Sequence, residues 1–144
     1  MIREAVKADL PGLLSLYLHL HERSVPEDGE RLRGVWARIL SDDGHHILVD
    51  EEAGRIVSSC VCVVVPNLTR DARPYALIEN VVTHADYRGQ GRATACLKRA
   101  VAIARAAGCY KVMLLTGARD AATLDFYRRA GFNSTDKTAF IQWL

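Results

Sequence analysis

The chain has 144 residues, of which 49% are hydrophobic and 25% are charged. This length and composition are typical of one compact domain with a sizeable core, so we expect a single domain over residues 1–144. The formal net charge of +2 is too small to indicate binding to nucleic acid or to an anionic membrane, and no cluster of Lys and Arg is interleaved with aromatic residues.

No stretch of the chain has the length of a membrane span. The longest nearly apolar run, residues 56–65, is far too short, and the N-terminus lacks an apolar signal segment preceded by basic residues. We therefore expect a cytoplasmic protein without a membrane partner. The cysteines form neither a C-x-x-C pair nor a dense disulfide pattern, so we expect buried thiols and no metal site. These cysteines are Cys60, Cys62, Cys96 and Cys109.

The N-terminal segment is expected to form a strand and two helices. Residues 1–6 have the pattern of a short strand, and Asp9 is the expected N-cap of a helix with Pro11 in its first turn. Residues 30–40 predict a second helix, whose apolar side includes Trp36. In the first helix, apolar residues recur at helical spacing as Leu10, Leu13, Leu14, Tyr17 and Leu20.

Residues 45–65 predict two strands joined by a turn at residues 51–54, which is a β-hairpin pattern. The second strand is apolar on both faces, as is typical of a strand inside a sheet. Residues 66–74 are polar and bounded by prolines, so we expect a surface loop. Its cations Arg70 and Arg73 are candidates for holding an anionic acceptor substrate; the alternative is that both are solvated loop arginines.

Residues 77–94, with the sequence LIENVVTHADYRGQGRAT, predict a buried strand that runs into a glycine-rich turn and then into a helix. Gly89 and Gly91 allow a sharp bend and leave room for a ligand to approach the main chain. Because the helix is expected to begin at about Gly91, its unpaired N–H groups and its dipole favour a negative group in the turn. A turn of this kind can bind a diphosphate.

Three families of phosphate-binding loop place a glycine-rich turn before a helix, and spacing separates them. A Walker A loop ends in Gly-Lys-Ser/Thr, whereas Gly91 is followed by Arg92 and an alanine. A Rossmann fingerprint needs a third small residue where Thr94 stands and an acid roughly 20 positions further on, near Cys109, where there is none. The pattern Arg-x-x-Gly-x-Ala over residues 88–93 instead resembles the acyl-CoA loop of the GNAT superfamily of N-acyltransferases.

The last third of the chain completes an alternation of helices and strands. The helix after the glycine turn is expected to end at Gly108 as its C-cap. Residues 110–115 then predict a buried strand, residues 121–130 a last helix and residues 139–144 a terminal strand. The predicted order is β-αα-βββ-α-β-α-β, which indicates an α/β domain with a mixed sheet.

The resemblance to the GNAT superfamily extends over nearly the whole chain. It rests on four blocks, which are residues 78–82 (IENVV), 87–93 (YRGQGRA), 108–111 (GCYK) and 126–132 (FYRRAGF). It implies the GNAT fold, with a V-shaped split between the central strand and the next, and acetyl-CoA as cosubstrate. The pantetheine would lie in this split and the diphosphate on the amides of the glycine turn. The implied acetyl-CoA-binding residues are Val81, Val82, Thr83, Arg88, Gly89, Gln90, Gly91, Arg92, Ala93, Thr94 and Tyr127.

The acceptor substrate is less well defined by these blocks. IENVV, YRGQG and GCYK are also similar to blocks of glucosamine-6-phosphate N-acetyltransferases, but such short blocks belong mainly to the cofactor-binding half. The resemblance implies that the first two helices cover the acceptor cleft, which makes Tyr17 and Trp36 candidates for lining it; core packing is the alternative for both. One departure is Asp120, which stands about where the family often has an asparagine, so one CoA-orienting contact is in doubt.

Acetyl transfer to an amine needs a group that accepts the proton of the amine, and it benefits from one that protonates the leaving thiolate. Glu79 is a carboxylate in an apolar strand, where desolvation would raise its pKa, so it is the candidate base and a candidate acceptor contact. The alternative is a structural or solvated carboxylate. Tyr127, with a reference pKa of about 10, is the candidate acid; packing beside Phe126 is its alternative.

We therefore expect an acetyl-CoA-dependent N-acetyltransferase that acts on a primary amine of a small molecule by direct attack. Three alternatives stay open: a GNAT-fold protein that senses acyl-CoA without turnover, an interaction protein that keeps only the fold, and an acetyltransferase of protein N-termini or lysines. The apolar terminal segment, with Phe140 and Trp143, needs cover and would form an exposed sheet edge, so we also expect a homodimer.

Overall fold

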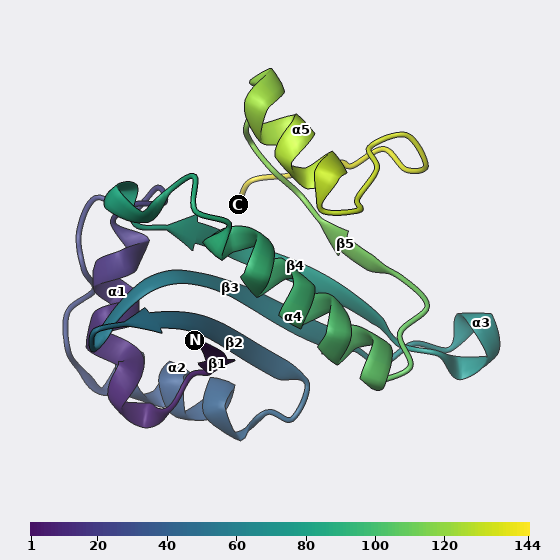
Figure 1. Ribbon diagram of the computed structural model, residues 1–144. Coiled ribbons are helices and arrows are strands. Elements are labelled where there is room, and N and C mark those ends of the chain that lie inside the picture. Colours follow the sequence, from purple (N-terminus) through teal and green to yellow (C-terminus); the bar gives the residue numbers. More distant parts are fainter. The chain divides into compact units, whose positions relative to one another are not determined.

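The computed structural model describes residues 1–144 as two compact units, Met1–Leu114 and Leu115–Leu144. The first unit contains a five-stranded sheet in the order β1-β2-β3-β4-β5 (Figure 1). Strands β1 to β4 are antiparallel neighbours, and β5 runs parallel to β4, so the predicted mixed sheet and α/β class are confirmed. The strands are β1 Ile2–Glu4, β2 His45–Glu52, β3 Arg55–Val65, β4 Tyr75–Thr83 and β5 Val112–Leu114.

The helices of the first unit lie on both faces of this sheet. Helices α1 and α2 pack on one face, where Leu13 and Trp36 join Val49 and Val61 of the strands in one apolar cluster. Helix α4 packs on the other face, against β2, β3 and β4. The helical elements are η1 Lys7–Asp9, α1 Leu10–Tyr17, α2 Glu30–Ser41, α3 Thr69–Ala72, η2 Ala85–Tyr87 and α4 Arg92–Ala106, with α5 Ala121–Arg129 in the second unit.

Strand β3 is the central element, as its apolar sequence predicts. Every residue from Ile56 to Cys62 is buried, because helices cover both sides of the strand. The side chains of neighbouring residues point to opposite faces, so Val49 of β2 belongs to the α1–α2 side and Asp50 reaches α4. This alternation places a carboxylate directly beneath the start of α4.

Asp9 is the N-cap residue of α1, as predicted. Its backbone is already helical, and its side chain makes no cap hydrogen bond to that helix. Its carboxylate instead accepts from the Val6 amide at 2.7 Å and closes the preceding turn η1. Arg3 holds the same carboxylate with two N–H···O bonds of 2.6 and 2.9 Å. The Asp9 carboxylate is held outside α1 because the long side chain of Arg3, on β1, reaches it. Local sequence patterns do not reveal this contact.

The expected surface loop between β3 and β4 is exposed and contains the single turn α3. Arg70, Asp71 and Ala72 all have positive φ angles, of 56°, 61° and 57°. The loop is attached to the far end of α4, since the Arg73 guanidinium donates to the carbonyls of Gly108 and Cys109, each at 3.2 Å. Arg73 therefore stabilises the junction between α4 and β5.

The second unit is built around α5. Asp120 is its N-cap and accepts from the Thr123 amide at 2.9 Å. The ring of Tyr127 lies against Phe126 and Phe132, with centroid separations of 5.0 and 6.5 Å. The terminal strand expected over residues 139–144 is not formed, because this segment pairs with no other strand and so has no ladder of hydrogen bonds.

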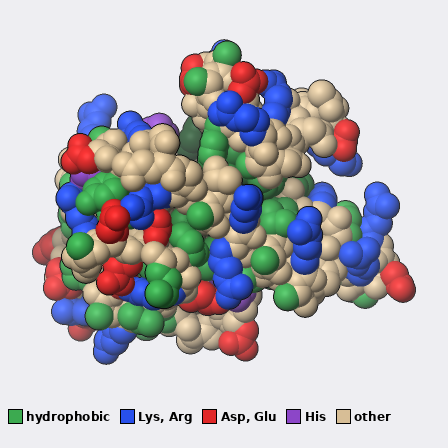
Figure 2. All heavy atoms as spheres, viewed as in Figure 1, with side chains coloured by type: hydrophobic (Ala, Val, Ile, Leu, Met, Phe, Trp, Pro, Cys, Tyr) green, Lys and Arg blue, Asp and Glu red, His purple; other side chains and the backbone are tan.

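The surface and the helices add two further observations. On the face shown in Figure 2, basic and acidic side chains are interspersed, so this face carries no extensive field of one sign. None of the helices combines the length and the apolar character that crossing a membrane requires.

Candidate functional site

Strand β4 carries a bulge at the position next to Glu79. Val61 of β3 pairs with Glu79 and Ser59 pairs with Val82, so the one residue between them on β3 faces both Asn80 and Val81. Asn80 has a φ of 51°, in the left-handed region that asparagine tolerates better than most residues. A bulge bends its strand and redirects the neighbouring side chains. The bend therefore changes the direction of β4 at Glu79.

Beyond the bulge, β4 has no strand neighbour on its β5 side. The parallel pairing covers only Ala76 to Ile78 of β4, and the strand continues to Thr83. A strand without a neighbour leaves backbone N–H and C=O groups free to pair with an extended ligand. The split that the family resemblance implies would lie on this side of β4.

The glycine-rich turn follows at the same end of β4. Gly89 and Gly91 have φ angles of 72° and 77°, and a Cβ at either position would have no neighbouring atom within 4 Å. Helix α4 begins at Arg92 with Gly91 as its N-cap, and no side chain caps it. Its first amides therefore face the turn without a side-chain acceptor, and the predicted helix start is confirmed.

Side chains in and beside the glycine turn contact neighbouring elements of the first unit. Arg88 donates to the carbonyl of Thr83 at 3.2 Å and to that of His19 at 3.4 Å. The hydroxyl of Thr83 lies 2.8 Å from that of Ser58 on β3. His84 precedes the turn and accepts from the Asp86 amide at 3.2 Å, which caps η2. The backbone on the N-terminal side of the glycines is thus held by neighbouring elements.

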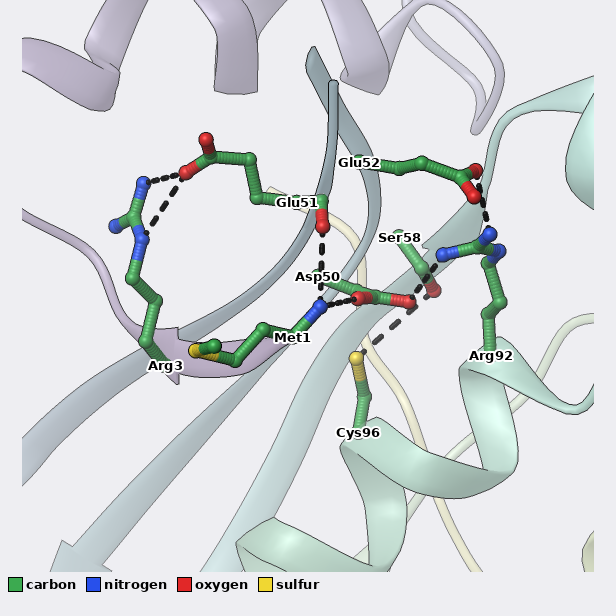
Figure 3. Close-up of polar contacts among 8 residues, drawn as sticks. All are labelled: Met1, Arg3, Asp50, Glu51, Glu52, Ser58, Arg92 and Cys96. Atoms are coloured by element: carbon green, nitrogen blue, oxygen red, sulfur yellow. Dashed lines mark hydrogen bonds and ion pairs between the residues drawn. The ribbon is translucent and has the colours of Figure 1, made fainter. Parts of the chain in front are cut away.

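Arg92 is directed away from the glycines. Its guanidinium donates to Asp50 at 3.0 Å and also to Glu52, as Figure 3 shows, and it lies 5.2 Å from the ring centroid of Tyr87. The predicted cofactor-binding role of this residue can therefore come from its backbone amide, while its side chain is bound to β2.

The predicted acceptor residues from the helices occupy different environments. Tyr17 is partly buried on α1, and burial raises its pKa to about 12, although a hydrogen bond with the Asn80 side chain acts in the opposite direction. This contact brings Tyr17 to the β4 bulge. Trp36 lies in the core, and its indole N–H donates to the Lys7 carbonyl at 3.2 Å, which agrees with packing as its main role.

The charged residues predicted to contact the acceptor, Glu79, Arg70 and Arg73, lie at different positions along β4 and the loop before it. Glu79 is exposed, so the desolvation expected for this carboxylate is absent. Arg70 and Arg73 precede β4, whereas the glycine turn follows it, and the nine residues of this strand span about 26 Å. Arg70 lies 5.5 Å from the ring centroid of Tyr110. The two arginines therefore lie at the opposite end of β4 from the glycine turn, and their contact with an anionic acceptor stays a prediction.

No group of three or more His, Cys, Asp or Glu side chains is arranged to hold a metal ion. A cavity of about 330 Å³ lies between α1 and the β2–β3 turn, and Ser15, Arg55 and His84 are among its lining residues. It contains none of the residues predicted to bind acetyl-CoA or the acceptor. The candidate site is instead the bulged end of β4 together with the glycine turn.

Comparison with known proteins identifies the family to which this arrangement corresponds. The family model for the acetyltransferase (GNAT) family matches residues 10–132. The chain belongs to the GNAT acetyltransferase family. Because the matched range covers the bulge, the glycine turn and the last helix, this GNAT assignment rests on residues of both units.

Relatives of this GNAT chain include enzymes with named activities. A glucosamine 6-phosphate N-acetyltransferase of Trypanosoma brucei brucei is 31% identical over 137 residues, which are 94% of this chain and 90% of that protein. A protein assigned as an acetyltransferase in Agrobacterium tumefaciens str. C58 is 42% identical, with a TM-score of 0.92 over 100% of this chain and 99% of that one. AAC(6')-Iy, in complex with the bisubstrate analog CoA-S-monomethyl-acetylneamine, has a TM-score of 0.79 at 16% identity over 100% and 97% of the chains, which shows the shared fold.

Reasoning from the sequence missed two features of this GNAT site. Asn80 supplies the left-handed residue of the bulge, and the signal for it was a polar residue within the apolar run IENVV. Asp50 binds Arg92 from 42 residues away, and no local pattern indicates this contact.

Proposed function

We propose that this GNAT protein is an acetyl-CoA-dependent N-acetyltransferase that acts on a primary amine of a small molecule. The observation that carries the proposal is the pairing of two features at one end of β4. The strand is bulged and has no strand neighbour on its β5 side after Ile78, and the glycine turn that follows it presents the uncapped start of α4. An extended pantetheine and a diphosphate require these two environments side by side.

In the proposed complex, backbone groups hold most of the cofactor. The pantetheine amides pair with the free edge of β4 at Val81, Val82 and Thr83. The diphosphate accepts hydrogen bonds from the amides of residues 88–94, where the helix dipole also favours negative charge. Tyr127 of α5 is the remaining residue proposed to contact the cofactor. Acetyl-CoA supplies the thioester, and its chemistry requires no metal.

The reaction then consists of attack by a neutral amine on the thioester carbonyl. Glu79 takes the proton of the amine, directly or through a water molecule, and Tyr127 donates a proton to the leaving CoA sulfur. The exposed position of Glu79 leaves its carboxylate accessible to an acceptor. Tyr17 stands beside the bulge through its contact with Asn80 and is the helix residue proposed to contact the acceptor.

The acceptor is proposed to be a small amine of the amino-sugar phosphate class. The glucosamine 6-phosphate N-acetyltransferase of T. brucei supports this choice, because it shares 31% identity over most of both chains. Acyl-CoA sensing without turnover, and acetylation of protein N-termini or lysines, are the alternatives that an assay must separate. A cytoplasmic location agrees with these substrates.

A free-thiol assay with an amine panel tests the proposal. Purified protein and acetyl-CoA are combined with glucosamine 6-phosphate, glucosamine, a diamine and a peptide with a free N-terminus and a lysine. We expect CoA release above the hydrolysis background with a small amine. Binding of acetyl-CoA with no release for any amine would favour a sensor, and release with the peptide alone would favour a protein acceptor.

We also propose that the chain forms a homodimer through its apolar terminal segment. Phe140 and Trp143 are 92% and 85% exposed, and an isolated apolar segment is a favourable site for pairing with a second copy. Light scattering at micromolar concentration should give twice the mass of the chain. A monomeric mass, unchanged when residues 139–144 are deleted, would contradict the proposal.

A further inference from the structure

Asp50 is a buried carboxylate at the end of β2, with 5% of the residue exposed. One of its oxygens accepts from Arg92 at 3.0 Å, and the other accepts from the Met1 ammonium at 2.8 Å (Figure 3). Burial alone would raise the pKa of this carboxyl, but the hydrogen bonds from the two cations more than offset the burial and hold its pKa below its ordinary value. Asp50 is therefore ionised at neutral pH.

Arg92, the partner of Asp50, is the first residue of α4 and is held from two directions. Asp50 and Glu52 bind its guanidinium from β2, and Tyr87 at the end of η2 lies against it. The glycines of the turn lie between Tyr87 and Arg92 in the sequence. The contact therefore fixes both ends of a segment whose two glycines make it flexible by itself.

An arginine is an unusual choice at this position for electrostatic reasons. The first turn of a helix is the positive end of its dipole, where a cation is unfavourable and an acid is preferred. The negative charges of Asp50 and Glu52 offset this cost, and they hold the Arg92 guanidinium against the sheet. A positive residue that is bound in this way is better suited to fixing the helix start than to holding a mobile phosphate.

We propose that Asp50, assisted by Glu52, is a positioning residue for the acyl-CoA turn. It holds Arg92 so that the backbone amides at the start of α4 point at the diphosphate before the ligand arrives, which removes part of the ordering cost of binding. The Arg92 guanidinium is then an anchor and not a phosphate ligand. This inference rests on the proposed function, because it assigns a role within the same acetyl-CoA site.

A double-mutant cycle separates an anchor from a phosphate ligand. The dissociation constant for acetyl-CoA is measured by calorimetry for wild type, Asp50→Asn, Arg92→Gln and the double variant. Because each single change removes one charge of the same ion pair, we expect each to weaken binding by about tenfold and the double variant to be no weaker than the weaker single variant. If Arg92 binds the diphosphate directly, Asp50→Asn will bind as tightly as wild type or more tightly, and this result would overturn the inference.

A second variant avoids the risk that loss of a buried carboxylate unfolds the protein. Glu52 is 47% exposed at its side chain, so Glu52→Gln should fold normally while it removes one of the two negative charges that bind Arg92. The matched control is Glu51→Gln, because Glu51 is 37% exposed and its carboxylate binds Arg3 instead. We expect a several-fold loss of acetyl-CoA affinity for Glu52→Gln and none for Glu51→Gln. Equal affinities for both variants and wild type would contradict the positioning role.

A truncated cosubstrate distinguishes positioning of the turn from general damage to the site. Acetyl-pantetheine lacks the diphosphate, so Glu52→Gln should raise the KM for acetyl-CoA and leave both the KM for acetyl-pantetheine and the kcat at saturation unchanged. An equal loss with both thioesters would show structural damage and overturn the inference. Wild-type protein that binds no acetyl-CoA would overturn the proposed function as well, whereas normal binding by every variant would overturn this inference alone.

Discussion

The imidazole rings of His19 and His84 lie in contact, with their centroids 4.0 Å apart and their planes tilted by 43°, which joins the segment after α1 to the residue that precedes η2. His19 also accepts from the Ala85 amide through Nδ1 at 3.4 Å and from Arg88 through its carbonyl. The segment that follows α1 therefore contacts the N-terminal side of the glycine turn at three points. A substitution that breaks this contact should therefore change both the stability of the first unit and the conformation of the glycine turn.

His84 should make the stability of the protein dependent on pH. Burial lowers its pKa, and the positive charge of Arg55 acts in the same direction. The unfolded chain therefore binds the His84 proton at a higher pH than the folded chain, and the free energy of unfolding should decrease as pH falls below about 6.5. Urea unfolding between pH 8 and pH 5 measures this slope.

Two histidine variants show whether His84 causes this dependence of the free energy of unfolding on pH. His84→Asn keeps a side-chain acceptor for the Asp86 amide but removes the imidazole, so it should flatten the pH dependence. His21→Asn, at an exposed position, should leave it unchanged. Identical slopes for wild type and His84→Asn would show that the pH dependence has another origin.

Gly91→Val should prevent acetyl-CoA from stabilising the protein. A bound ligand raises the melting temperature by mass action. Valine at a φ of 77° costs about 1–2 kcal/mol and moves the amides at the start of α4, although the added side chain meets open space. We expect the fold to persist in the absence of ligand and the ligand-induced rise in melting temperature to disappear.

The control for this change lies at the other end of the same helix. Gly108 has a φ of 79° and also open space around its Cβ position, so Gly108→Val introduces a similar strain away from the turn. It should keep the acetyl-CoA-induced rise. A rise of the same size in Gly91→Val would exclude the glycine turn as the diphosphate site.

Glu79→Gln should lower turnover most at the acidic end of the pH profile. In the proposed mechanism the amine is protonated there and depends on the Glu79 carboxylate to remove its proton, whereas a higher pH supplies free amine and should restore part of the rate. Loss of a general base typically costs about 10²- to 10⁴-fold. Rates of CoA release against pH measure this effect. A profile that matches wild type in shape and height would make Glu79 structural.

Tyr127→Phe should lower kcat with little change in the affinity for acetyl-CoA. In the proposed mechanism the phenol interacts with the sulfur only as negative charge develops on it, so the loss should appear in the transition state. Phenylalanine keeps the packing against Phe126 and Phe132. Tyr110→Phe serves as the control, because Tyr110 packs with Tyr75 at the opposite end of β4. Wild-type turnover in Tyr127→Phe would reduce Tyr127 to a packing role.

Several elements were predictable because their signals are local. The apolar run of β3 predicts a buried central strand, and residues 77–94 predict a strand, a turn and a helix that begins at about Gly91. Glycine spacing determines such a turn without help from distant residues. The terminal strand over residues 139–144 was predicted from an apolar pattern alone and is wrong, since a strand exists only when a neighbour pairs with it.

The sequence by itself determined the α/β class, the order of most elements, the glycine turn and the resemblance to the GNAT acetyltransferases, because periodicity and short motifs are properties of neighbouring residues. Only the tertiary structure decided that Asn80 forms a bulge beside Glu79, that Glu79 is exposed, and that Arg92 turns toward Asp50 on β2. These features depend on strand register and on contacts between residues far apart in the chain. Register and long-range contacts arise from packing the whole sheet and its helices together, so no local window of the sequence contains them.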